Sequence, residues 1–356
     1  MAMNRRLFLL LSLCGFLQGC STLEYYAQSV GGHLSLMGKS RPIGTVIEDP
    51  STPERLKVRL QKIREMRRFA VESLRLPENG SYDSYADLNR EAVVWSLVAA
   101  PEFSVQAKTW CYPFIGCASY RGYFDKADAE RHADDLRDKG LDVAVEPVPA
   151  YSTLGWFDDP LPSTVIDWPE EQVAGLMFHE LAHQLIYVKD DSTFNESFAS
   201  AIEQVGVERW LEREGDQAAI TSWHDTLQRE EAFVELLLST RDELQGLYAQ
   251  SHDKDEMRRR KAAVFGGLER DYKALRERWG GYGGYDRWFS RGLNNARLAS
   301  IATYEQWVPA FLYLLRRERV MEDFYAACRR LARLPYQERQ QALDRLLVQS
   351  RQAAER

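Results

Sequence analysis

The chain has 356 residues, with 46 lysines and arginines against 53 aspartates and glutamates, which gives a formal net charge of −7. An acidic chain without an evident basic face is poorly suited to grip nucleic acid, so we expect no nucleic-acid partner. We find no internal repeat, low-complexity tract or linker rich in proline and serine, which favours a single domain over residues 20–356.

The first 19 residues have the features of a secretory signal. Arg5 and Arg6 precede an apolar run, Leu7 to Leu17, which is too short to span a membrane as a helix. The run ends at a Gln-Gly-Cys sequence that resembles the lipobox of bacterial lipoproteins. This resemblance implies a lipidated Cys20 that anchors the chain to the membrane at the bacterial cell envelope, on the outer membrane and facing the periplasm. The alternative is an ordinary cleaved signal in which Cys20 has no role.

Helical and extended patterns alternate in the first half of the chain. Within a helical region at residues 50–100, apolar spacing predicts helices over Pro53 to Leu74 and Tyr85 to Ala99. Residues 101–157 have the pattern of a small sheet with a crossover helix. The expected strands are Phe103 to Trp110, Tyr120 to Phe124 and Leu141 to Val148, and the expected helix is Asp125 to Lys139, ended by Gly140.

The segment from Pro149 to Trp156 is a candidate substrate edge. An exposed sheet edge can hold an extended peptide as an added strand, through main-chain hydrogen bonds. The alternative is an ordinary strand that leads into a turn.

The cysteines are typical of an oxidising compartment. Cys111 and Cys117 enclose a short loop that contains proline and glycine, which predicts a local disulfide. A metal site there is disfavoured because no nearby pair supplies the remaining ligands. Cys328 lies in a helical pattern and is expected to be a buried thiol.

The sequence His179-Glu180-Leu181-Ala182-His183 is the motif most indicative of chemistry. Two histidines four residues apart lie on one face of a helix, where both imidazoles can reach a single zinc ion. Glu180 lies beside the metal position, where a carboxylate can accept a proton from an activated water molecule. Apolar spacing predicts an amphipathic helix, with Asp167 as its N-cap and Pro169 just inside. The alternative is a surface helix with two incidental histidines.

Glu196 is the predicted third metal ligand. A short polar turn joins the motif helix to a second helix, so that residues 167–214 form a helical hairpin that presents Glu196 to the histidines. Three protein ligands leave a fourth position open, which separates a catalytic zinc site from a structural one. A glutamate near a helix N-terminus can instead be only a favourable dipole partner, and Asp190 and Asp191 are rival ligands. Glu203 shares a face with Glu196 and is a candidate hydrogen-bond acceptor for a ligating histidine.

The C-terminal part, residues 220–350, has a mostly helical pattern. Long helices are predicted over Glu230 to Gln250 and over Lys254 to Trp279, and the charges of the second are typical of a solvated face. Gly280 to Tyr285 predicts a loop that interrupts the helices. Tyr304, downstream of the metal helices, is the leading candidate for the donor that stabilises a tetrahedral oxyanion, and the alternatives are His224 and Tyr151.

The sequence HELAH followed by NESFAS resembles the gluzincin peptidases, in which HExxH on one helix is joined by glutamate on the next. The segments AYSTLGWFDDPLPST and NNARLASIATY resemble a bacterial family of aminopeptidase-like proteins, over most of the mature chain. This resemblance implies a predominantly helical α+β fold with a zincin-like catalytic core and a small β-sheet preceding the motif helix. It also implies zinc held by His179, His183 and Glu196, with Glu180 as general base. The chain lacks the GxMEN motif that binds the substrate amine in well-studied gluzincin aminopeptidases.

These features predict a zinc metallopeptidase with peptide substrates, and they leave three hypotheses open. The first is an aminopeptidase, and the second is an envelope endopeptidase or cell-wall peptide hydrolase. The third is a non-catalytic zinc-containing lipoprotein scaffold, which Glu180 disfavours because a structural site needs no base. An aminopeptidase must bind a substrate α-ammonium group with further carboxylates, for which Asp158, Asp159 and Glu203 are candidates. A solvated turn is the alternative role for Asp158 and Asp159.

Overall fold

The structure is a computed structural model that describes residues 25–112, 116–301 and 306–354. The predicted signal sequence, Cys20 and Tyr304 lie outside these ranges. After a helix at residues 25–38, the first half contains β1 (Ser40–Pro42), α2 (Ile43–Glu48), α3 (Glu54–Glu72), β2 (Ser84–Ala86), β3 (Val94–Pro101), β4 (Trp110–Tyr112), β5 (Gly116–Ala118), β6 (Arg121–Tyr123), α4 (Lys126–Arg137), β7 (Leu141–Val148) and β8 (Leu161–Pro162).

The second half is helical. A 3-10 turn (Ser163–Val165) precedes α5 (Glu170–Leu185), α6 (Ser192–Glu214), α7 (Gln217–Tyr248), α8 (Lys254–Arg278), α9 (Asp286–Ser290), α10 (Asn295–Ile301), α11 (Val308–Glu318), α12 (Met321–Ala332) and α13 (Tyr336–Ala354). Helices with small sheets before α5 confirm the predominantly helical α+β class. No helix of the described ranges combines the length and apolar character needed to cross a membrane.

The larger sheet has the strand order β6-β3-β7, with both outer strands antiparallel to β3. Strands β6 and β7 are therefore parallel, and α4 makes the crossover between them, as predicted. Asp125 caps α4 by accepting a hydrogen bond from the backbone N–H of Asp128, and Gly140 follows the helix with a φ of 78°.

The predicted helix over Tyr85 to Ala99 is wrong, because this region contains β2 and β3. Strand β3 is apolar from Val94 to Ala100 except for the half-buried Ser96, and it is buried on both faces, so it lacks the alternation that distinguishes a half-buried strand. The predicted strand over Phe103 to Trp110 is also wrong. Residues 102–109 form turns after β3, and a hydrogen bond from the Lys108 N–H to the Ala99 carbonyl closes them.

The predicted substrate edge over Pro149 to Trp156 is not a strand. Strand β7 ends at Val148, and the chain then runs without regular structure to β8, which pairs with β2. Leu154 and Gly155 have φ values of 56° and 83°, and this left-handed backbone is incompatible with a continuous strand.

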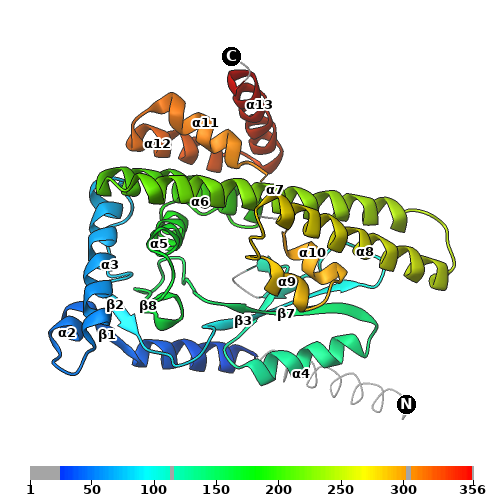
Figure 1. Cartoon of the computed structure of the whole chain (residues 1–356), viewed down its shortest axis with the longest axis horizontal. Helices are drawn as coiled ribbons and strands as arrows, with labels where there is room; N and C mark the ends of the chain where they lie inside the picture. Colours follow the sequence, from blue (N-terminus) through cyan, green and yellow to red (C-terminus); the bar gives the residue numbers. More distant parts are fainter. Residues whose placement is uncertain (1–24, 113–115, 302–305, 355–356) are drawn as a thin grey trace, which may run out of the picture.

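Helices α5 and α6 form the centre of the largest apolar core. Figure 1 shows α5 nearly along its axis beneath α6, so the two helices cross, with α3 beside them and α11 to α13 on the other side of α6. Phe178 on α5 and Phe198 on α6 are fully buried in this core. Gly206 permits the close approach of α6, because a Cβ there would lie 2.7 Å from the Phe178 ring.

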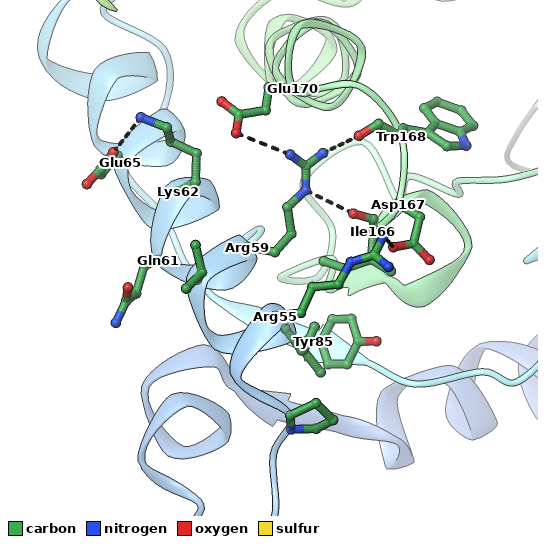
Figure 2. A pocket seen from close by; sticks show the side chains of 13 residues that line it. Arg55, Arg59, Gln61, Lys62, Glu65, Tyr85, Ile166, Asp167, Trp168 and Glu170 are labelled. Carbon is green, nitrogen blue, oxygen red and sulfur yellow. Dashed lines mark hydrogen bonds and ion pairs between the residues drawn. The ribbon is translucent and has the colours of Figure 1, made fainter.

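Arg59 on α3 fixes the start of α5. Its guanidinium group donates hydrogen bonds to the carbonyl oxygens of Ile166, at 2.9 Å from Nε, and of Trp168. Figure 2 shows these bonds on the wall of a surface cavity between α3 and the residues that precede α5. Arg55 pairs with Asp167 at 2.8 Å across the same gap. The cavity therefore lies next to an anchoring point of the motif helix.

Candidate metal centre

Helix α5 carries the motif but begins later than predicted. Its first residue is Glu170 and its N-cap is Pro169, whereas the predicted cap, Asp167, has its carboxylate on Arg55. The acidic first turn, Glu170 and Glu171, favours this helix start through the macrodipole.

The turn between α5 and α6 is held by the side chains of Asp191 and Asn195. Asp191 caps α6 by accepting a hydrogen bond from the Phe194 N–H at 3.1 Å, and its carboxylate is buried against Arg339 at 2.7 Å. Asn195 bonds to both backbone groups of Val188, accepting at 2.7 Å and donating at 2.8 Å. Asp191 is therefore committed to the fold and is not available as a metal ligand.

The side chains of His179, His183 and Glu196 converge on one point. Nε2 of His179 lies 3.2 Å from Nε2 of His183 and 3.3 Å from Oε2 of Glu196, and the remaining pair of atoms is 3.6 Å apart. Ligands at the usual zinc bond length, arranged tetrahedrally, are separated by about 3.3 Å. These three residues can therefore hold one metal ion, with a fourth position left for another ligand.

Glu203 supports the cluster from behind. Its Oε2 lies 3.0 Å from Nδ1 of His179, so the carboxylate accepts a hydrogen bond from this nitrogen and leaves Nε2 free to coordinate. Gly175 makes room for this contact, because a Cβ there would lie 3.0 Å from Oε1 of Glu203. By contrast, Nδ1 of His183 is buried and has no hydrogen-bond partner among the described residues.

The electrostatics of the metal-free cluster follow from these contacts. Burial lowers the pKa of His179, but the carboxylates of Glu196 and Glu203 outweigh burial and raise it well above the usual value. Burial likewise raises the pKa of Glu196, yet the two histidines bring it down to about 2. The cluster is therefore a strongly polar centre within an apolar core.

Glu180 lies next to the cluster on α5, half-buried and without an ion pair in the described part of the chain. Groups on other segments of the chain interact with its carboxylate, among them Tyr82 and Asp159. Burial and then Glu180 raise the pKa of Tyr82 far above its usual value, and Glu180 contributes in the same sense at Asp159. The Glu180 carboxylate is thus next to His179 in the sequence and within electrostatic range of a second acidic residue, Asp159.

Other sequence candidates lie elsewhere. Nε2 of His224, on α7, contacts Glu208 at 3.3 Å, far along α6 from Glu196. The ring of Tyr151 packs edge-on against Phe124 and His33. Neither His224 nor Tyr151 is part of the cluster of His179, His183 and Glu196.

Two tyrosines near Glu196, Tyr187 and Tyr120, were not predicted from the sequence. The ring of Tyr187 lies edge-on to that of His183, with centroids 6.4 Å apart, and partial burial and Glu196 raise its pKa. Partial burial and the Glu196 carboxylate also raise the pKa of Tyr120, to about 12. Tyr187 follows His183 by four residues and lies just beyond the end of α5 at Leu185, and this spacing was the available signal. Tyr120 approaches only through the tertiary fold.

Cys111 and Cys117 form a disulfide that links β4 to β5. Cys328 is a buried free thiol, and burial raises its pKa.

The fold and the cluster define a predominantly helical α+β protein with a His-His-Glu centre between two crossing helices. The model of a family described as "Putative aminopeptidase" matches residues 24–343. Because the match covers most of the chain, the protein belongs to this family, which supports a peptidase-like hydrolytic function. No curated protein and no solved structure matches the chain.

Proposed function

We propose that this protein is a zinc-dependent aminopeptidase that hydrolyses peptides at the bacterial cell envelope. The observation that carries the proposal is the spacing of the three donor atoms, at 3.2, 3.3 and 3.6 Å, which fits the edges of a zinc tetrahedron. Two imidazoles and one carboxylate with an open fourth position are the donor set of catalytic zinc sites.

In this proposal each residue has a distinct role. When bound, zinc supplies Lewis acidity toward a water molecule and a substrate carbonyl. Glu180 accepts a proton from the attacking water and passes it to the leaving amine. Glu203 keeps the proton of His179 on Nδ1 and so fixes the orientation of the ring. A phenol supplies the hydrogen bond to the oxyanion, and Tyr304 stays our prediction for this donor.

The metal and the base are tested with one set of variants of the full-length protein, purified in detergent. The wild type should contain about one zinc per chain by mass spectrometry, and His179→Ala, His183→Ala and Glu196→Ala should lose it. Glu180→Gln should keep zinc but lose peptide hydrolysis by about 10²- to 10⁴-fold. His224→Ala is the matched histidine control and should retain both properties. Equal hydrolysis by Glu180→Gln and the wild type would show that this residue is not the base.

We also propose that the chain is a lipoprotein anchored through Cys20 to the outer membrane. Labelling cells with a palmitate analogue should mark the wild type, and Cys20→Ala should abolish the label. A wild type that remains unlabelled and is released as soluble protein contradicts the anchor. This result would leave the metal chemistry unaffected.

A further inference from the structure

A buried carboxylate next to Glu180 has no role in the metal centre. Asp159 lies in the irregular segment before β8 and is only 1% exposed. Its Oδ2 accepts hydrogen bonds from the Thr153 N–H at 2.8 Å and the Ser152 hydroxyl at 3.4 Å. Its Oδ1 is buried and has no hydrogen-bond partner among the described residues. An unpaired buried carboxylate oxygen is costly and therefore needs an explanation.

Hydrogen bonds connect Asp159 to the face of α5 that bears the base. The Asp159 N–H donates to the Ser81 hydroxyl oxygen at 3.3 Å, and Nε2 of Gln184 donates to the same oxygen at 3.2 Å. Gln184 follows Glu180 by one helical turn, so the two side chains share a face of α5. Burial raises the pKa of Asp159, and the nearby Glu180 carboxylate acts in the same direction, as expected for two acids of like charge.

A cationic ligand would satisfy the free oxygen and relieve this repulsion. We propose that Asp159 binds the α-ammonium group of the substrate and so restricts the centre to peptides with a free N-terminus. This inference rests on the proposed peptidase function, and it identifies a carboxylate for the amine in a chain without the GxMEN motif.

The other acidic candidates are already engaged. Asp158 is exposed, and its Oδ1 accepts a hydrogen bond from the Gly80 N–H at 3.1 Å. Glu203 is held by His179. The buried cation of this region, Arg67, donates through Nε and Nη2 to the carbonyl oxygens of Pro77, Asn79 and Ser81, and it forms no ion pair with Asp159 in the described ranges.

The backbone around Asp159 is strained. Tyr82, whose N–H donates to the Asp159 carbonyl at 2.8 Å, is fully buried with a φ of 67°, and Leu154 has a φ of 56°. Such conformations cost free energy in bulky residues and concentrate at ligand sites. Ser152 and Thr153 donate hydrogen bonds to the Asp159 carboxylate and cover it. Entry of an ammonium group therefore requires this segment to move. Trp156 in the same segment is 85% exposed, so its side chain does not anchor the segment to the core.

Asp159 is tested with the full-length zinc-loaded protein in detergent and three versions of one short peptide. The versions carry a free N-terminus, an acetylated N-terminus, or no α-amino group. We expect the wild type to cleave the free peptide about 10- to 100-fold more efficiently than the other two, in kcat/KM. Asp159→Asn should lose this preference, mainly through a higher KM for the peptide with a free N-terminus.

Asp158→Asn is the matched control and should keep the preference. The zinc content of Asp159→Asn shows whether this variant retains its fold. If it loses zinc, the inference is tested by the wild type alone, through its cleavage of the free and the des-amino peptide. A preference that survives in zinc-loaded Asp159→Asn overturns the inference, and so does equal cleavage of the free and des-amino peptides by the wild type.

A binding measurement separates this inference from the proposed function. In a Glu180→Gln background, leucinamide and its acetylated form are titrated against tryptophan fluorescence. Leucinamide should bind about 10- to 100-fold more tightly, and the added Asp159→Asn change should remove the difference. If the wild type hydrolyses none of the peptides, the proposed function fails, while selective leucinamide binding through Asp159 still supports the inference. Equal binding of the two compounds contradicts it.

Discussion

Gly175 lies on α5 one turn before His179, at the point where Glu203 approaches from α6. A Cβ at this position would lie 3.0 Å from Oε1 of Glu203, 3.2 Å from its Cγ and 3.4 Å from Cγ2 of Val207. Because these distances are shorter than ordinary contacts, Gly175→Ala should push the Glu203 carboxylate away by a few tenths of an ångström. The hydrogen bond that holds Nδ1 of His179 at 3.0 Å should then weaken, although every metal ligand is retained.

The expected effects on zinc affinity and on stability have opposite signs. Complete loss of an outer hydrogen-bond partner lowers metal affinity about 10- to 100-fold, so Glu203→Ala should cost about 1.4 to 2.7 kcal/mol. Gly175→Ala displaces the partner without removing it, and we expect about 3- to 10-fold weaker binding. In a helix interior, glycine to alanine contributes up to about 1 kcal/mol of stability, which the steric contact partly offsets. The metal-free variant should therefore unfold at the same or a higher urea concentration.

Zinc affinity is measured by competition with a chelator, and stability by urea unfolding after metal removal. Gly246→Ala on α7 is the matched control, because no atom lies within 4 Å of a Cβ there, and it should leave zinc affinity unchanged. Unchanged zinc affinity in Gly175→Ala, with weaker binding in Glu203→Ala, would refute the steric argument. Loss of both affinity and stability in Gly175→Ala would instead indicate overpacking between α5 and α6.

Three further predictions concern stability. In the metal-free protein the pKa of His179 is raised, so the stabilisation from its ion pairs is complete below pH 6.5 and is lost as the pH rises through the raised pKa. The unfolding temperature of the wild type should therefore fall between pH 6 and pH 9 by more than that of His179→Gln. Arg339→Met leaves the carboxylate of Asp191 buried and unpaired, and urea unfolding should show a loss of about 3–5 kcal/mol. Gly206→Ala places a Cβ 2.7 Å from the Phe178 ring, and the same assay should show a loss of about 1–3 kcal/mol.

The helices that carry the centre were predictable because their signals are local. Repeating apolar positions identified α3, α5 and α6 to within a few residues, and the i, i+4 spacing placed both histidines on one face. Strand β3 was misread because it is buried on both faces, so its sequence carries no period of two. Burial on both faces depends on helices that are distant in the sequence, and no local pattern reports it.

Of the residues around the metal ligands, Glu203 was predictable from the sequence, whereas the position of Asp159 was not. Glu203 follows Glu196 by two helical turns, so sequence spacing alone made it a candidate partner for a histidine, and its Oε2 lies 3.0 Å from His179. Asp159 comes from a segment without regular structure, and only its packing against residues 81 and 82 brings it to α5. The sequence contained both Asp158 and Asp159, but only the fold shows which of them is buried.

The adjacent residues Asn195 and Glu196 have different roles in the centre: Asn195 holds the turn between the helices, and Glu196 is the candidate metal ligand. Asn195 bonds to both backbone groups of Val188, which closes the turn after α5 and fixes where α6 begins. Since Glu196 is the next residue, its direction is set by that closure, and its Oε2 arrives 3.3 Å from His179 and 3.6 Å from His183. The short connection between the helices is therefore sufficient for ligation because a neutral amide holds the turn, which leaves the carboxylate free for the metal position.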